Sequence, residues 1–261
     1  MFDLDRIGGA HALDHLVDAV LEAGEIALRL YRGGAAARTE RKPDRSPVTE
    51  ADREVERHLR AYLDEAHPAA AFLGEESGEG AGTSDLRFVV DPIDGTRAFV
   101  RGIPTWSILL GLEAEGEPVL GVAYMPAAGD LFVGVQGHGA TANGRPCRVS
   151  QVADAADAAI GHGALAQFTD EGMGPALERL AVGTDTQRGF ADFANYRELL
   201  LGRLDAVVDP GVQPYDVCPA AVLVREAGGR FSDFGGAPTI HGRGFVASNG
   251  PVHDAILALL A

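Results

Sequence analysis

The sequence predicts a mixed fold, α+β in residues 1–150 and α/β in residues 151–261. Three patterns support this prediction. Two amphipathic helical segments open the chain, strand-like segments without helices between them fill its middle, and strand-like and helical segments alternate in its second half. With 261 residues, of which 46% are hydrophobic, the chain is long enough to bury a sizeable core.

Two helices are expected before the first strand. Apolar residues recur at helical spacing through residues 13–30, and a second apolar face runs through residues 55–63. Thr49 and Asp52 have the spacing of a capping box at the start of the second helix. The polar stretch at residues 38–47 contains two prolines and no periodicity, so we expect an exposed loop there.

The middle of the chain is expected to form an antiparallel meander. Residues 88–90 are a short apolar run, typical of a buried strand. Three further runs, at residues 108–112, 119–124 and 131–135, follow one another with only short turns between them. Strands joined in this way pair antiparallel. Asn143-Gly144 then predicts a tight hairpin.

The second half is expected to alternate strands with helices. The predicted strands are residues 158–161, 206–208 and 245–247, and the predicted helices are residues 171–180, 217–227 and 253–260. This alternation is typical of an α/β arrangement.

Composition limits the partners of the protein. It has 38 acidic and 22 basic residues, a net charge of −16, which argues against nucleic acid or an anionic membrane but suits bound divalent cations. Cys147 and Cys218 fit no metal-ligand pattern and are expected to be reduced thiols of a cytoplasmic protein. The first residues lack the apolar segment of a signal peptide, and no apolar run is long enough for a membrane span.

The segment Asp91-Pro92-Ile93-Asp94-Gly95-Thr96 carries the clearest chemical signal. Two carboxylates directly follow a predicted buried strand, and their spacing lets both point at one cation. The following residues predict a short helix, whose first N–H groups would face an anion. A plain surface turn is the alternative, because Asp, Pro and Gly are turn formers.

Two other acidic positions are weaker signals. Glu75 and Glu76 follow a short apolar pair, and adjacent glutamates are ordinarily found in a solvated loop. Asp216 opens the helix predicted over residues 217–227, where an aspartate is a common N-cap. Asp52, likewise, could be no more than the acid of its capping box.

Together these signals form a recognisable set. Lys42-Pro43 with the segment at residues 46–52, Gly74-Glu75-Glu76, the segment at 91–96, and Pro214-Tyr215-Asp216 with the Glu-Ala-Gly-Gly at 226–229 occur in one order and spacing. Over essentially its full length the chain resembles the inositol monophosphatase superfamily. The resemblance implies a layered αβαβα sandwich, a homodimer, and a phosphatase that binds two or three Mg²⁺ ions.

The resemblance also implies roles for individual residues. Glu75, Asp91, Asp94 and Asp216 correspond to side-chain metal ligands, with the backbone carbonyl of Ile93 as a further ligand. Thr96 and Asp52 correspond to the pair that orients and deprotonates the attacking water, the amides of Gly95 and Thr96 hold the phosphate, and Glu76 and Lys42 support the site. These residue types suit the chemistry, because Mg²⁺ prefers oxygen ligands and lets a bound water act as the nucleophile.

The substrate is less constrained by the sequence. Three segments, at residues 41–48, 99–106 and 189–193, are similar to the histidinol-phosphatase branch of the superfamily. Asp192 and Asp209 add carboxylates near the expected substrate pocket, and a carboxylate forms charge-assisted hydrogen bonds with the ammonium or imidazole of histidinol phosphate. Asp192 could instead be a solvated loop acid or a partner of a nearby arginine. The leading hypothesis is thus a histidinol-phosphate phosphatase. The alternatives are an inositol-1-phosphatase and a non-catalytic metal-binding regulatory protein.

Overall fold

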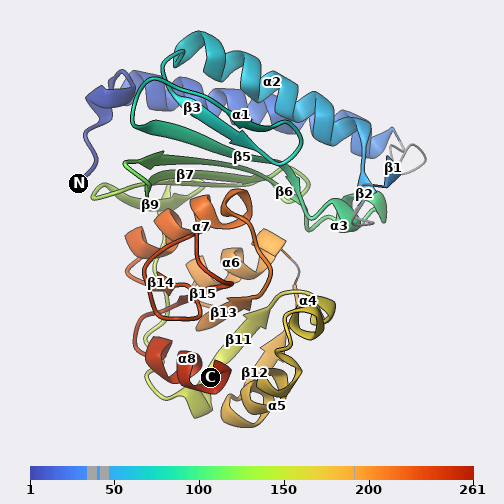
Figure 1. Cartoon of the computed structure of the whole chain (residues 1–261), viewed down its shortest axis with the longest axis vertical. Helices are drawn as coiled ribbons and strands as arrows, with labels where there is room; N and C mark the ends of the chain where they lie inside the picture. The colour runs from blue at the N-terminus through green and yellow to red at the C-terminus, as the bar shows by residue number, and fades with distance from the viewer. Residues whose placement is uncertain (34–39, 42–46, 191) are drawn as a thin grey trace.

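The computed structural model describes residues 1–33, 40–41, 47–190 and 192–261. The chain forms five layers, helix–sheet–helix–sheet–helix, which are stacked along the long axis of the molecule (Figure 1). The expected layered α+β sandwich is therefore confirmed. No helix within the described ranges combines the length and the apolar character needed to cross a membrane.

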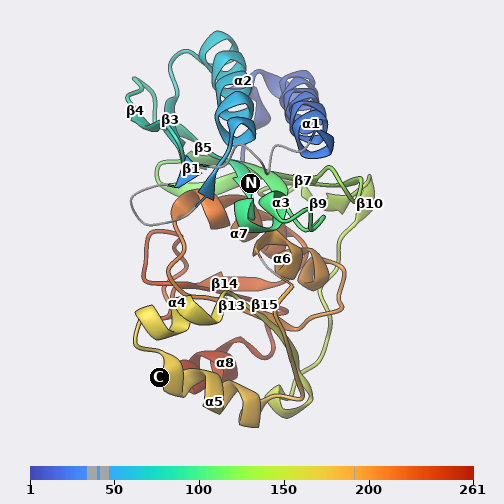
Figure 2. The same cartoon turned by 90° about the vertical axis from the view of Figure 1, so that its right-hand side faces the viewer.

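The first layer is the helix pair α1 (Gly9–Arg32) and α2 (Glu50–Ala66), which lie side by side on the first sheet (Figure 2). Both helices are amphipathic, and their apolar faces join the strands in one core cluster. The capping box of Thr49 and Asp52 is present at the start of α2. The preceding stretch, expected as a loop, contains a short strand pair, β1 (Glu40–Arg41) and β2 (Pro47–Val48).

The second layer is an eight-stranded sheet with the order β10-β9-β8-β7-β6-β5-β3-β4. Its strands are β3 (Ala71–Gly74), β4 (Gly78–Gly80), β5 (Leu86–Asp94), β6 (Ser107–Ala114), β7 (Glu117–Met125), β8 (Asp130–Val135), β9 (Gly139–Ala142) and β10 (Arg145–Pro146). The expected meander and the hairpin at Asn143-Gly144 are confirmed, since β5 to β10 pair antiparallel in sequence order. The strand β3, which was not predicted from the sequence, pairs parallel with β5.

The third layer contains α6 (Asp192–Leu200) and α7 (Pro214–Glu226), packed between the two sheets. Two glycines let α7 approach the first sheet closely. A Cβ added at Gly111 on β6 would lie 2.4 Å from the Cys218 sulfur, and one at Gly121 on β7 would lie 2.7 Å from the Pro219 Cα. The backbone of α7 is therefore pressed onto the middle of the sheet.

The fourth layer is a five-stranded mixed sheet with the order β12-β11-β13-β15-β14, and helices cover its outer face. Its strands are β11 (Ala159–His162), β12 (Thr186–Arg188), β13 (Ala206–Asp209), β14 (Arg230–Ser232) and β15 (Phe245–Ser248). The helices outside it are α4 (Leu165–Asp170), α5 (Gly174–Gly183) and α8 (His253–Leu260). Along β13, Val207 joins the core with α7, whereas Ala206 and Val208 join the outer core.

Candidate active site

The strand β5 supplies the first two carboxylates. The sequence predicted that the strand ends at residue 90, but β5 continues to Asp94, and its pairing with β6 becomes irregular between Asp91 and Asp94. The Ile93 N–H donates to Asp91 Oδ1 at 3.1 Å, which holds this carboxylate against the strand. Asp91 is 2% and Asp94 7% exposed, so neither is the surface acid of a plain turn.

The helix α7 supplies the third carboxylate. Asp216 is the third residue of α7 rather than its opening residue, and its Oδ2 accepts the Gln213 N–H at 2.6 Å in a capping box. Because α7 is pressed onto β6 and β7, this helix start reaches the end of β5. Asp91, Asp94 and Asp216 each offer one oxygen atom, and these three atoms lie within 4.8 Å of one another.

Glu75 approaches from the neighbouring strand. It follows β3, which is parallel to β5, and its N–H donates to the Val90 carbonyl at 3.1 Å. Glu75 therefore lines the same cavity, of about 150 Å³, as the three aspartates. The described residues that line it are Glu75, Asp91, Ile93, Asp94, Gly95, Thr96, Arg97, Asp192 and Asp216. All five positions named as metal ligands from the sequence thus lie at one cavity.

Asp91, Asp94 and Asp216 resist ionisation together. Burial and the negative charges of Glu75 and Asp94 raise the pKa of Asp91 well above its usual value. Burial and the charge of Asp192 do the same for Asp94, and burial raises the pKa of Asp216 to about 7. No lysine or arginine of the described residues forms an ion pair with these three aspartates. A bound divalent cation would remove this repulsion, and an all-oxygen donor set suits Mg²⁺.

Asp52 and Thr96 meet at the edge of the cavity. The Thr96 hydroxyl lies 3.2 Å from Asp52 Oδ1 and 3.0 Å from the Ile93 carbonyl oxygen. Asp52 Oδ2 accepts the N–H and the hydroxyl of Thr49, at 2.7 and 2.6 Å, and so completes the capping box. Asp52 is fully buried, and this burial raises its pKa. One carboxylate therefore caps α2 and also contacts the hydroxyl of Thr96.

Asp192 also lines the acidic cavity. It is the first residue of α6 and has a left-handed backbone, with a φ of 46°. A Cβ added at Gly95 would lie 2.8 Å from Asp192 Oδ2, so this carboxylate reaches the loop that follows Asp94. Burial raises the pKa of Asp192 to about 6, and the charge of Arg97 opposes the shift. Asp192 is thus a half-buried acid at the cavity, not a solvated loop residue.

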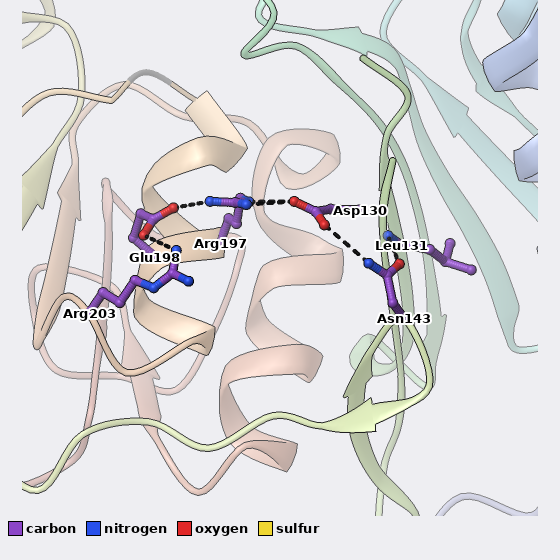
Figure 3. A network of polar contacts seen from close by, with 6 residues as sticks. All are labelled: Asp130, Leu131, Asn143, Arg197, Glu198 and Arg203. Carbon is purple, nitrogen blue, oxygen red and sulfur yellow. Dashed lines mark hydrogen bonds and ion pairs between the residues drawn. The ribbon is translucent and has the colours of Figure 1, made fainter. Parts of the chain in front are cut away.

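A network of polar contacts ties α6 to the first sheet (Figure 3). Arg197 on α6 binds Asp130 at the start of β8 with a closest distance of 2.7 Å, and it also pairs with Glu198. Asp130 in turn accepts from the Asn143 amide at 3.1 Å, and Asn143 Oδ1 accepts the Leu131 N–H at 2.8 Å. The start of α6 contacts the cavity directly, because the Phe193 N–H donates to Asp94 Oδ2 at 2.8 Å.

A second, larger cavity adjoins the first. It has a volume of about 480 Å³ and shares Arg97 and Asp192 with the acidic cavity. Ile103 and Phe190 give it apolar walls, while Arg101 and His162 add polar groups. The sequence analysis did not identify this cavity, because its walls come from three segments that are distant in sequence.

Three other residues were predicted to belong to the site, and none of them is found among the described residues that line the two cavities. Asp209 is buried and accepts the Tyr196 hydroxyl at 2.7 Å, and it is not among the described residues that line either cavity. Glu76 follows Glu75 and lines a separate cavity on the side of α2. Lys42 lies outside the described residues. The supporting roles expected for Glu76 and Lys42, and the substrate contact expected for Asp209, stay predictions.

The sequence analysis missed Ser107, whose hydroxyl donates to Asp94 Oδ2 at 2.7 Å. It also missed the backbone contact from Phe193 to the same oxygen. A signal for Ser107 was available, because it opens β6 and pairs with Asp94 in an antiparallel register. The contact from Phe193 had no such signal, since it joins residues 99 positions apart.

A comparison with models of protein families identifies the family of this chain. The model of the inositol monophosphatase family matches residues 10–261. The chain belongs to the inositol monophosphatase family. The expected family, and with it the phosphomonoesterase class, is confirmed.

Individual family members show the same relationship over nearly full length. The chain is 35% identical to a histidinol-phosphatase of Streptomyces coelicolor, over 98% of this chain and 97% of the relative. It is 36% identical to a histidinol-phosphatase of Mycobacterium tuberculosis, over 93% and 95%. Among solved structures, the extragenic suppressor protein SuhB of Bartonella henselae superposes with a TM-score of 0.87 at 30% identity, covering 96% of this chain and 98% of that one.

Proposed function

We propose that the protein hydrolyses histidinol phosphate to histidinol and phosphate, and that it needs Mg²⁺ to do so. The observation that carries the metal dependence is the cluster of Asp91 and Asp94, which are buried, with Asp216, which is half-buried. With Glu75 these residues would hold two or three ions, and the Ile93 carbonyl would add a ligand. Bound Mg²⁺ supplies a water of lowered pKa and stabilises the charge that develops on the phosphate oxygens.

The residues beside the metal ligands would handle the proton. The Thr96 Oγ would accept a hydrogen bond from the attacking water and donate its own proton to Asp52 Oδ1, which lies 3.2 Å away. The raised pKa of Asp52 makes it a better proton acceptor than an exposed aspartate. The amides of Gly95 and Thr96, at the start of α3 (Thr96–Val100), would hold the phosphate.

The substrate proposal rests on relatives and on the second cavity. Both relatives at 35–36% identity are named histidinol-phosphatases. Asp192 lies where the two cavities meet, so its carboxylate can bind a cationic group that extends from the phosphate into the larger cavity. The apolar side chains of Phe190 and Ile103 suit a flat ring such as imidazole.

Inositol 1-phosphate is the second candidate substrate. An IMPase of Thermotoga maritima superposes with a TM-score of 0.85 at 30% identity, covering 95% of this chain and 96% of that one. Arg97 and Arg101 also line the larger cavity, and their positive charges do not favour a cationic substrate. The two hypotheses therefore differ in whether the charge of Asp192 outweighs that of the arginines.

A substrate panel tests the proposal. Phosphate release is measured with histidinol phosphate, inositol 1-phosphate and p-nitrophenyl phosphate, each with Mg²⁺ and with EDTA. We expect Mg²⁺-dependent hydrolysis with the highest kcat/KM for histidinol phosphate. A higher kcat/KM for inositol 1-phosphate would favour the second candidate, and activity that persists in EDTA would refute the metal dependence. The homodimer implied by the family is checked separately by light scattering.

A further inference from the structure

Glu56 is a buried carboxylate that neither the sequence analysis nor the proposed chemistry uses. It lies on α2 and is only 4% exposed. Its Oε2 accepts the Glu76 N–H at 2.8 Å, and its Oε1 accepts the Ser77 N–H at 2.7 Å. Both donors belong to the turn that begins with Glu75. The two oxygens of one side chain therefore hold two consecutive backbone amides directly after a proposed metal ligand.

The local sequence makes room for this contact. A Cβ added at Gly74, the residue before Glu75, would lie 2.6 Å from Glu56 Oε2 and 2.6 Å from the Phe72 ring. A side chain at that position would push Glu56 away from the turn. Glu56 itself is held firmly, because the neighbouring α2 residues Val55 and Leu59 are fully buried in the core.

The same helix also carries Asp52, one turn before Glu56. Side chains four residues apart lie on one face of a helix, so α2 presents both carboxylates to the same side. Asp52 contacts Thr96, and Glu56 contacts the turn of Glu75. Two parts of the acidic cavity, Thr96 and the turn of Glu75, are thus both held by side chains of the same helix, α2.

We propose that Glu56 is a positioning residue that fixes the turn bearing Glu75 and thereby sets the affinity of the site for divalent cations. This inference rests on the metal site of the proposed function. Buried carboxylate–amide hydrogen bonds are charge-assisted, and such bonds are stronger than neutral ones. Partners that orient metal ligands typically change metal affinity by about 10–100-fold when they are mutated.

The test measures the binding of Mn²⁺ alone to the full chain by electron paramagnetic resonance, without substrate. Glu56→Gln keeps the size of the side chain but places an NH₂ group against one of the two N–H donors. We expect this change to raise the Kd for Mn²⁺ about 10–100-fold. A thermal melt of the metal-free variant verifies that it is folded.

The matched control is Glu113→Gln. Glu113 is 1% exposed and, like Glu56, accepts two donors, here Arg87 Nε at 2.7 Å and a nitrogen of the His241 ring at 2.5 Å. Arg87 lies at the opposite end of β5 from Asp91 and Asp94, so this substitution removes a comparable buried charge far along the strand from the cavity. We expect its Kd for Mn²⁺ to equal that of the wild type.

A second variant keeps the proposal testable if Glu56→Gln fails to fold. Gly74→Ala displaces the same contact from its other side, and we expect it to weaken Mn²⁺ binding as well. An unchanged Kd in both variants would overturn the role of Glu56 while leaving the metal site intact, as would an equal loss in Glu113→Gln. A wild type that binds no Mn²⁺ would overturn this inference together with the proposed metal dependence.

Discussion

The charge of Asp192 is the feature that the substrate proposal depends on most. Asp192→Asn removes this charge and keeps the shape of the side chain. Asparagine is a better replacement than alanine, because residue 192 has a φ of 46° and asparagine adopts left-handed backbone more readily than most residues. The variant therefore tests charge without adding backbone strain.

The size of the effect follows from the protonation state and from the lost hydrogen bond. The pKa of Asp192 is raised to about 6. In an assay at a pH about 1.5 units above this pKa, most Asp192 side chains therefore carry their negative charge. Losing a hydrogen bond to a charged group costs about 1.5–3 kcal/mol. We therefore expect kcat/KM for histidinol phosphate to fall roughly 10–100-fold. Arg97 already offsets part of the charge of Asp192, which favours the lower end of this range.

The assay compares three substrates in the wild type and the variant at saturating Mg²⁺. The rate with p-nitrophenyl phosphate should be retained, because that ester presents no cation to Asp192. Saturating Mg²⁺ is needed in this comparison, because Asp192 lines the acidic cavity and the loss of its negative charge removes attraction for a bound cation. Equal losses on histidinol phosphate, inositol 1-phosphate and p-nitrophenyl phosphate would show that Asp192 is structural and refute the reasoning.

Three further predictions concern the metal, the proton relay and acid stability. Asp91→Asn should abolish phosphate release even at saturating Mg²⁺, because it removes a charged ligand; a near-normal single-turnover rate would contradict the metal mechanism. Thr96→Ala should lower kcat about 10²–10⁴-fold with little change in KM, Asp52→Asn should do the same, and steady-state kinetics of the double variant should show little extra loss. Burial lowers the pKa of His253 to about 4, so between about pH 6.5 and pH 4 the unfolded chain binds a proton at this residue that the folded chain does not, and the contribution of His253 to stability should fall by about 3 kcal/mol. The raised pKa values of Asp91, Asp94 and Asp216 act in the opposite sense, so this contribution is read from the difference between the wild type and His253→Asn. In denaturant unfolding across this range, the stability of the wild type should fall relative to that of His253→Asn, and parallel profiles would contradict the assignment.

Much of the fold was predictable because its elements carry local signals. The apolar faces of α1 and α2, the short turns of the meander and the hairpin at Asn143-Gly144 each depend on neighbouring residues. The helix α6 was missed because it packs between two sheets and shows no clear apolar face, with Phe193, Ala194, Asn195 and Tyr196 all buried in succession. The strand β3 was missed because only its pair Phe72-Leu73 stood out as apolar, and two residues are too few to predict a strand.

The candidate site could be predicted only by combining several acidic segments that are weak signals individually. Asp91 and Asp94 come from one segment, but the sequence could not tell a turn from a strand end there, because the irregular register of β5 between these residues involves the distant strand β6. The larger cavity and the contacts of Glu56 had no signal at all. Backbone amides that bind a distant carboxylate are present in every residue, so nothing in the sequence marks the ones that Glu56 selects.

The sequence left open whether Asp52 and Asp216 are helix caps or functional acids. In this fold each residue can fill both roles. In both residues Oδ2 accepts the N–H of the N-cap residue, which leaves the other oxygen at a fixed position beside the cavity. At Asp52 that second oxygen contacts Thr96. An asparagine at position 52 can keep the capping contact with its single oxygen while turning its NH₂ group to Thr96. Asp52→Asn should therefore lose kcat and keep stability, whereas Asp52→Ala should also lose about 1 kcal/mol of stability, because the Thr49 N–H loses its acceptor in the capping box.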